Sequence, residues 1–199
     1  MADSNLHKKL TYRDYCASNS NTRIEIIDGI VYDKSTLESI HSDTVPAYVH
    51  QDISMELARQ IANFLVGKPC KVNQAPFDVI LHEEGEEADA ATTVLQPDIV
   101  VVCDETKRQK TCCVGAPDIV MEVLSPSTAN YDMVTKRLIY EKHGVREYFI
   151  VDPERRLVMA FRLTDGKYTN VQIIPEDEKL TSEVLPGLEI DLSRVFAQV

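Results

Sequence analysis

Glu122 stands in an otherwise apolar run, "IVMEVL", which covers residues 119 to 124. Apolar residues on both faces of such a run are typical of a central strand that is buried on both sides. A carboxylate in that setting loses its hydration, so it must take a proton, accept hydrogen bonds or meet a cation. Glu122 is therefore either a buried glutamate with one structural partner or part of a functional site.

A second acid, Asp98, opens the apolar run "QPDIVVVC" at residues 96 to 103. Strands that are neighbours in sequence pair as antiparallel neighbours by default. If Cys103 lies opposite Pro117, the same register places Asp98 opposite Glu122, with β carbons about 4.5 to 5.5 Å apart. Like charges so placed repel unless one is protonated or a cation lies between them. A hard divalent ion such as Mg²⁺ suits this pair because it prefers oxygen ligands and retains water.

A lysine follows on the next element. The segment 127–144 predicts a helix that ends at Gly144, and Asp132, Lys136 and Tyr140 share one of its faces. In one interpretation Asp132 and Lys136 form a surface pair that contributes little to stability. In the other, Lys136 lies over the strand ends beside the two carboxylates, where it orients a water or stabilises charge on a phosphate.

Hydrophobic periodicity and turn residues indicate the elements that must position these side chains. A short helix over residues 10–18 precedes a hairpin over 22–33 that turns at Asp28-Gly29, and a longer helix covers 49–69. Further strands are expected at 77–81, 96–103, 117–124, 146–152, 156–163 and 168–175. The pattern predicts an α/β (α+β) fold with a mixed β-sheet flanked by helices. We expect one domain over residues 1–199, with residues 1–46 as an N-terminal helix–hairpin extension packed on the core.

Composition narrows the class of protein. The chain has 199 residues, and its 44% hydrophobic and 27% charged content is that of an ordinary globular domain. The net charge of −11 counts against broad attraction to nucleic acid or anionic membrane. Basic residues cluster at Lys107, Arg108 and Lys110, and again between Lys136 and Arg146. Such clusters are usually solvated faces, although a local basic groove stays open as an alternative.

Compartment is predicted from cysteines and hydropathy. The five cysteines are odd in number and lack disulfide-framework spacing, which favours a reducing compartment. The start of the chain lacks the apolar stretch of a signal peptide, and no run is long enough to span a bilayer. We therefore expect a cytoplasmic protein without a membrane partner.

Five motifs together carry a family resemblance: "RIEIIDG", "HQDI", "QPDIVVVCDE", "GAPDIVMEVLSPST" and "YDMVTKRLIYEKHGVREYFIVDP". In this order they resemble the Uma family of bacterial endonucleases, in the restriction-endonuclease-like PD-(D/E)xK superfamily. The resemblance covers nearly the whole chain, from about Leu10 to the final "LPGLEIDLSRVF". It implies a mixed-sheet core, a divalent metal, Mg²⁺ or Mn²⁺, and hydrolysis of DNA phosphodiester bonds.

The resemblance also assigns roles. Asp98 matches the acid of the PD motif and Glu122 the (D/E) position, so both become catalytic residues and metal ligands. The superfamily pattern then has lysine two residues later, where this chain has Leu124. Lys136, on the following helix, takes that catalytic role instead. The main-chain carbonyl of Val123 is implied as a further metal ligand.

Glu25 and His50 match N-terminal motifs of the family and are accessory candidates. Glu25 alternates with apolar neighbours in its strand, so it points either to solvent or to the site. His50 lies near the start of its helix, where a structural hydrogen bond is the alternative to a role in the site.

Three hypotheses follow. The first is a metal-dependent endonuclease that cuts DNA, and double-strand cleavage would call for a homodimer. The second, favoured by the acidic charge, is a non-catalytic interaction or regulatory module on a nuclease-like fold. The third, a hydrolase of a smaller phosphate ester, shares the site of the first. An open cleft with basic walls favours an enzyme, and an enclosed site favours the non-catalytic module.

Overall fold

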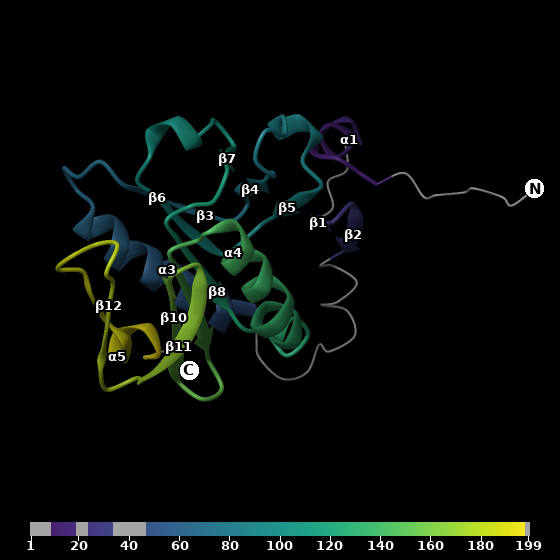
Figure 1. Ribbon diagram of the computed structural model, residues 1–199. Helices are drawn as coiled ribbons and strands as arrows, with labels where there is room; N and C mark the ends of the chain where they lie inside the picture. Colours follow the sequence, from purple (N-terminus) through teal and green to yellow (C-terminus); the bar gives the residue numbers. More distant parts are fainter. Residues whose placement is uncertain (1–8, 19–23, 34–46, 198–199) are drawn as a thin grey trace, which may run out of the picture.

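The computed structural model describes residues 9–18, 24–33 and 47–197 (Figure 1). Its helical segments are α1 (Tyr12–Ala17), α3 (Ala47–Phe64), η1 (Ala88–Ala90), η2 (Glu105–Lys107), η3 (Tyr131–Lys136), α4 (Arg137–His143) and α5 (Leu192–Val195). Its strands are β1 (Ile24–Ile27), β2 (Ile30–Asp33), β3 (Lys71–Gln74), β4 (Asp78–Leu81), β5 (Thr93–Leu95), β6 (Ile99–Val102), β7 (Cys112–Val114), β8 (Ile119–Val123), β9 (Glu147–Asp152), β10 (Leu157–Thr164), β11 (Lys167–Pro175), β12 (Lys179–Thr181) and β13 (Glu189–Asp191).

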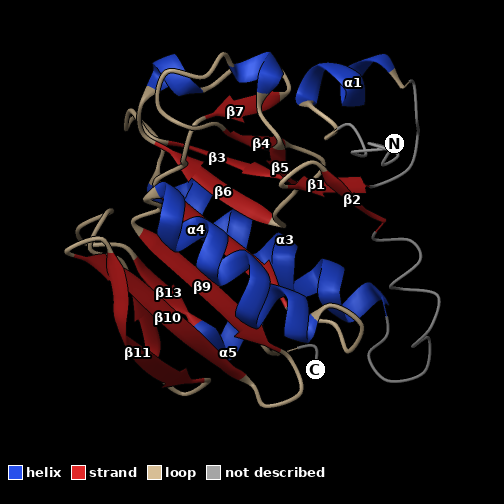
Figure 2. Ribbon diagram, turned by 45° about the vertical axis from the view of Figure 1, so that its right-hand side comes forward, coloured by secondary structure: helices blue, strands red, loops and turns tan. Residues whose placement is uncertain are grey.

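The strands form two large mixed sheets, and Figure 2 shows the smaller sheet above the larger. The six-stranded sheet has the order β11-β10-β9-β8-β6-β3, in which β8 and β9 are parallel and the other neighbours antiparallel. The five-stranded sheet has the order β2-β1-β5-β4-β7, and β12 pairs with β13 separately. The predicted α+β fold with a mixed sheet and flanking helices is confirmed, although the sequence indicated one sheet where the structure has more.

Apolar side chains form one core cluster on each face of the six-stranded sheet. Helix α3 buries Ile53, Leu57 and Ile61 against one face, and Phe64 packs beside them partly buried. Tyr140 of α4 belongs to the cluster on the other face, together with residues of the five-stranded sheet such as Val79. Both sides of β8 are therefore covered, as its continuous apolar sequence predicts.

The register between β6 and β8 agrees with the register that the sequence predicts. Ile99 lies opposite Met121 in this antiparallel pair, and Val101 lies opposite Ile119. The same register extends by one residue to place Asp98 opposite Glu122. Residues that oppose each other across an antiparallel pair share one face of the sheet, so both carboxylates belong to the face that carries α4.

The helix after β8 is not a uniform α-helix. Residues Tyr131–Lys136 form the π-helical segment η3, which continues directly into α4. The predicted end is confirmed, because Gly144 adopts a left-handed conformation with φ 84°. π-helical turns occur often at functional sites. Here the wide turn carries both Asp132 and Lys136.

The described part of the N-terminal extension contains the expected short helix and hairpin. Strands β1 and β2 pair through Ile27 and Ile30, and the turn residues Asp28 and Gly29 have φ of 51° and 83°. Two positive φ angles are typical of the tightest hairpin turns and favour glycine. A Cβ atom at Gly29 would also lie 2.5 Å from Cβ of Lys9. Strand β1 joins the five-stranded sheet through β5, which brings Glu25 towards β8.

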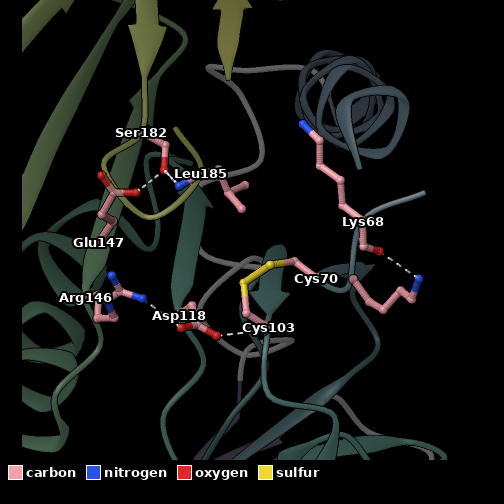
Figure 3. Close-up of a disulfide and its surroundings, with 9 residues drawn as sticks. Lys68, Cys70, Cys103, Asp118, Arg146, Glu147, Ser182 and Leu185 are labelled. Atoms are coloured by element: carbon pink, nitrogen blue, oxygen red, sulfur yellow. Dashed lines mark hydrogen bonds and ion pairs between the residues drawn. A yellow bond between two sulfur atoms is a disulfide. The ribbon is translucent and has the colours of Figure 1, made fainter. Parts of the chain in front are cut away.

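A disulfide bond joins Cys70, just before β3, to Cys103, just after β6 (Figure 3). The spacing of the cysteines did not predict this pair. Their number and spacing favoured a reducing compartment, in which all five thiols would be free, but Cys70 and Cys103 are bonded to each other. Cys16, Cys112 and Cys113 are free thiols. In the described part of the chain, no helix is both long enough and apolar enough to cross a membrane.

Candidate active site

Lys136 is enclosed by three carboxylates that come from three parts of the chain. Its Nζ lies 2.7 Å from Oε1 of Glu122, 3.1 Å from Oδ1 of Asp132 and 3.2 Å from Oε1 of Glu25. The lysine side chain is 0% exposed, and none of the three acids exceeds 3%. A solvated Asp132–Lys136 pair, the first interpretation of this spacing, is therefore wrong.

Electrostatics keep Lys136 charged despite this burial. Loss of hydration by itself lowers the pKa of a lysine. The charges of Asp132, Glu122 and Glu25 outweigh that loss and raise the pKa of Lys136 well above its ordinary value. One cation thus faces three acids, so the cluster is negative when all are ionised.

Two tyrosines, Tyr140 buried and Tyr131 partly buried, donate hydrogen bonds to two of these carboxylates. The hydroxyl of Tyr140 lies 3.3 Å from Oε1 of Glu122, and that of Tyr131 lies 2.9 Å from Oε2 of Glu25. Burial, followed by the nearby carboxylate charge, raises the pKa of both tyrosines far above the ordinary value. Both hydroxyls therefore stay protonated and act as donors at neutral pH. The ring of Tyr131 also lies 5.3 Å from Nζ of Lys136.

Asp98 lies at the more exposed end of the site. Its Oδ2 accepts a hydrogen bond of 2.8 Å from the main-chain N–H of Val123 and lies 3.1 Å from Nε2 of His50. The main-chain N–H of Asp98 points in turn to Oε2 of Glu122 at 3.4 Å. The side chains of Asp98 and His50 are 16% and 27% exposed. Solvent thus reaches the site beside the first turn of α3, whereas Lys136 lies behind Glu122.

Glu25 points into the site, which settles the choice that its strand pattern left open. The main-chain N–H of Gln96 donates to Oε1 of Glu25 at 2.8 Å. The side-chain amide of Gln96 donates to Oδ1 of Asp78 at 2.7 Å and contacts the hydroxyl of Tyr15 at 3.2 Å. Burial raises the pKa of Asp78, against the hydrogen bond from Gln96. Helix α1, β4 and β5 together therefore fix the position of Glu25.

The structure brings together all five residues that the sequence singled out: Glu25, His50, Asp98, Glu122 and Lys136. Leu124, at the superfamily's usual lysine position, packs instead in the apolar core. The ammonium group in the site comes from the helix, as proposed. The ammonium group of Lys136 forms ion pairs with Glu122, Glu25 and Asp132. Asp98, the other acid that the sequence placed beside it, is not among these partners.

Sequence reasoning missed the supporting residues Asp78, Gln96 and Tyr131. Gln96 could have been identified from the sequence, because it stands two residues before Asp98 in the same motif. Asp78 carries a weaker signal, a lone acid at the start of the apolar run "DVIL". The contact between Tyr131 and Glu25 joins residues 106 positions apart, and no local pattern indicates such a contact.

The residues present fit a hard divalent ion only in part. Two carboxylates in register on adjacent strands, near a main-chain carbonyl, are oxygen donors of the type that Mg²⁺ prefers. Within residues 9–18, 24–33 and 47–197, however, no group of three or more His, Cys, Asp or Glu side chains is arranged to hold a metal. An ion at Asp98 and Glu122 would therefore depend on main-chain oxygen and water for its remaining ligands.

Comparison with known proteins places the chain in a family. A family model described as "Uma2: Putative restriction endonuclease" matches residues 10–193. The chain belongs to the Uma2 family. A solved structure described as a "putative nuclease belonging to DUF820", from Anabaena variabilis, has a TM-score of 0.71 at 17% identity and covers 94% of this chain and 98% of that one. That likeness shows that the two chains share their overall fold.

One curated relative of this Uma2 member is an uncharacterized protein, slr1290, from Synechocystis. The two sequences are 30% identical over 104 residues, which span 51% of this chain and 50% of the relative. The match thus spans about half the length of the curated relative.

Proposed function

We propose that this protein is a metal-dependent endonuclease that hydrolyses DNA phosphodiester bonds at Asp98 and Glu122. The observation that carries the proposal is the pairing of these two acids across β6 and β8, with a charged lysine bound to Glu122. Membership of the Uma2 family supports the same reaction class.

Each residue has a distinct part in the proposed reaction. Asp98 and Glu122, with the carbonyl of Val123, would hold Mg²⁺ or Mn²⁺. That ion would supply an activated water and neutralise charge on the scissile phosphate. Lys136 places positive charge beside Glu122, on the side away from solvent. His50 holds Oδ2 of Asp98 from the solvent side.

Glu25 has an accessory part in the proposed site. It shares Lys136 with Glu122 and is fixed by the main chain of Gln96. In this position it sets the direction from which the ammonium approaches Glu122. A contact between Glu25 and the substrate is not part of the proposal, because the Glu25 side chain is 0% exposed.

The proposal is tested by incubating purified protein with supercoiled plasmid and with single-stranded DNA, in Mg²⁺, Mn²⁺ or chelator. We expect cleavage with metal and none with chelator. Nicked plasmid indicates one active centre per encounter. Linear product formed directly indicates that two copies act together, as a homodimer would.

The alternative is a non-catalytic interaction or regulatory module. Two observations favour it: the net charge of −11 and the enclosure of Lys136 at 0% exposure. A module of this type would not hydrolyse DNA, even if it kept a metal site at Asp98 for stability. The same assay separates the two functions, because the alternative predicts no cleavage in any of the conditions.

A further inference from the structure

A groove of about 300 Å³ runs beside the free edge of β3, and we refer to it as the β3-edge groove. It is lined by Lys71, Val102, Glu105 and Arg108. Lys71 belongs to the edge strand, whereas Glu105 and Arg108 come from the connection between β6 and β7. Segments that are distant in sequence therefore bring two cations to one cavity.

The groove lies on the same face of the six-stranded sheet as Asp98 and Glu122. Asp98, Val100 and Val102 alternate along β6, so their side chains share that face. Lys71 lies opposite Val102 and Asn73 opposite Val100, which places both residues of β3 on it too. Val102 is four residues from Asp98, or about 13 Å along the strand. A DNA duplex that reached Asp98 could therefore span the distance to the groove.

The cations of the groove lack acidic partners. In the described part of the chain, Nζ of Lys71 donates to the carbonyl of Lys68 and Nε of Arg108 donates to Oδ1 of Asn73, both neutral oxygens. Neither side chain forms an ion pair among those residues. Their positive charge is therefore available to a ligand.

Basic side chains without an ion pair are found mainly near this groove. Most described basic side chains form ion pairs, including Lys142 with Glu83 and Lys179 with Glu189. Those that form none are Lys9, Lys68, Lys71, Lys107, Arg108, Lys110 and Arg137, and all except Lys9 and Arg137 belong to the groove or to its flanking segments. Among the described residues, basic side chains without an ion pair are thus concentrated beside one groove, in segments that also carry Asp104 and Glu105.

We infer that the β3-edge groove binds the phosphodiester backbone of DNA, as a contact separate from the acidic centre. The inference rests on the proposed function for its choice of ligand. Cations from a rigid strand and a neighbouring turn attract phosphate without reading sequence. The groove would thus hold the substrate on a protein whose net charge otherwise repels it. Glu105 opposes phosphate there and limits the affinity.

The test measures binding of a fluorescent DNA duplex to a background variant, Glu122→Gln, in chelator, so that cleavage cannot interfere. In that background, the double substitution Lys71→Gln and Arg108→Gln removes two phosphate contacts. Each contact contributes about one unit to the slope of log affinity against log salt, so the slope should become less steep by about two. Glu105→Gln should instead tighten binding.

A matched control removes the same charge elsewhere. Lys179→Gln with Arg194→Gln alters two exposed cations, each already paired with an acid. The inference predicts that this control keeps the native salt slope. Equal effects of the two double variants would overturn the inference, because a general change of charge would then explain both. An unchanged slope in the groove variant would overturn it as well.

Failure of this inference is distinguishable from failure of the proposed function. If native protein cuts DNA and Glu122→Gln does not, but the groove variant binds DNA as its background does, the groove inference is wrong and the nuclease stands. If native protein cuts nothing while binding still depends on Lys71 and Arg108, the groove inference stands and the nuclease is wrong. Melting temperatures establish that every variant is folded.

Discussion

At the scale of single residues, the surroundings of Lys136 decide how the site is held. Its spacing from Asp132 and Tyr140 was visible in the sequence, but its complete burial was not. The burial depends on Glu25, which reaches Lys136 from a strand more than 100 residues away. A helix pattern reports which residues share a face, but it does not report what covers that face.

Replacing Lys136 with methionine should strongly destabilise the fold. The change would leave Glu25, Glu122 and Asp132 buried without their cation. Breaking a buried pair in this way costs roughly 3–5 kcal/mol of unfolding free energy. Urea unfolding at neutral pH measures the loss. Adding Glu122→Gln to the variant should restore part of it, because one of the uncompensated charges is removed.

Lys142→Met serves as the control for this substitution. Lys142 lies 2.5 Å from Glu83, but the two side chains are 58% and 64% exposed. An exposed pair of this kind contributes about 1 kcal/mol or less. Equal losses for the Lys136 and Lys142 variants would contradict the role of Lys136 as the charge that neutralises the site.

At the scale of elements, the strands that lie within longer apolar runs were predictable, and β3, β5 and β7 were not. The runs that became β6 and β8 are apolar on both faces, so the sequence indicated their burial, and the register between them followed. Strand β3 is mostly polar, "KVNQ", and β5 and β7 have three residues each, too few to show a period. The second sheet was missed because it depends on β5 and β7.

The sequence pattern also did not predict the π-helical turn of η3. The π-helical segment has only six residues, too few to change the apolar pattern of the longer helix visibly. The structure anchors this turn at both ends: the hydroxyl of Tyr148 donates to the carbonyl of Asp132, and Lys136 binds Glu122. Tertiary contacts rather than helix propensity therefore set its shape.

The disulfide between Cys70 and Cys103 should stabilise the pairing of β3 with β6. It closes a loop with a sequence separation of 33 residues. Loop-closure entropy for such a loop corresponds to roughly 3–4 kcal/mol of unfolding free energy. Reductant should lower the unfolding midpoint in urea accordingly. The double variant Cys70→Ala and Cys103→Ala should show the lower midpoint with or without reductant, and an effect of reductant on that variant would contradict the assignment.

At the scale of the whole molecule, metal binding should be visible as added stability. If Asp98 and Glu122 hold Mg²⁺ or Mn²⁺ in the folded state alone, an ion at tenfold its Kd adds about 1.4 kcal/mol. For a chain of this size that raises the melting temperature by about 3 to 5 °C. Asp98→Asn should reduce the rise, whereas Asp177→Asn, an exposed acid outside the site, should keep it. Identical melting curves in metal and chelator would count against a metal site.

The net charge of −11 makes the whole molecule a poor general attractor of DNA. A nuclease with this charge needs local cations, which the β3-edge groove supplies, or a neutralising ion at the acidic centre. Because few phosphate contacts hold the substrate in either case, affinity for DNA should fall only modestly as salt rises. Under the proposed function, the charge therefore requires that the contacts with DNA be concentrated in one place.

The most direct test of the central claim compares plasmid cleavage by native protein and by Glu122→Gln, at equal concentration in Mg²⁺ and in Mn²⁺. The matched control is Glu147→Gln, a buried acid of the same sheet that binds Arg162 and Ser182 instead of the site. The account predicts that native protein and the folded Glu147 variant cut DNA, and that the folded Glu122 variant does not. Undiminished cleavage by Glu122→Gln would contradict it.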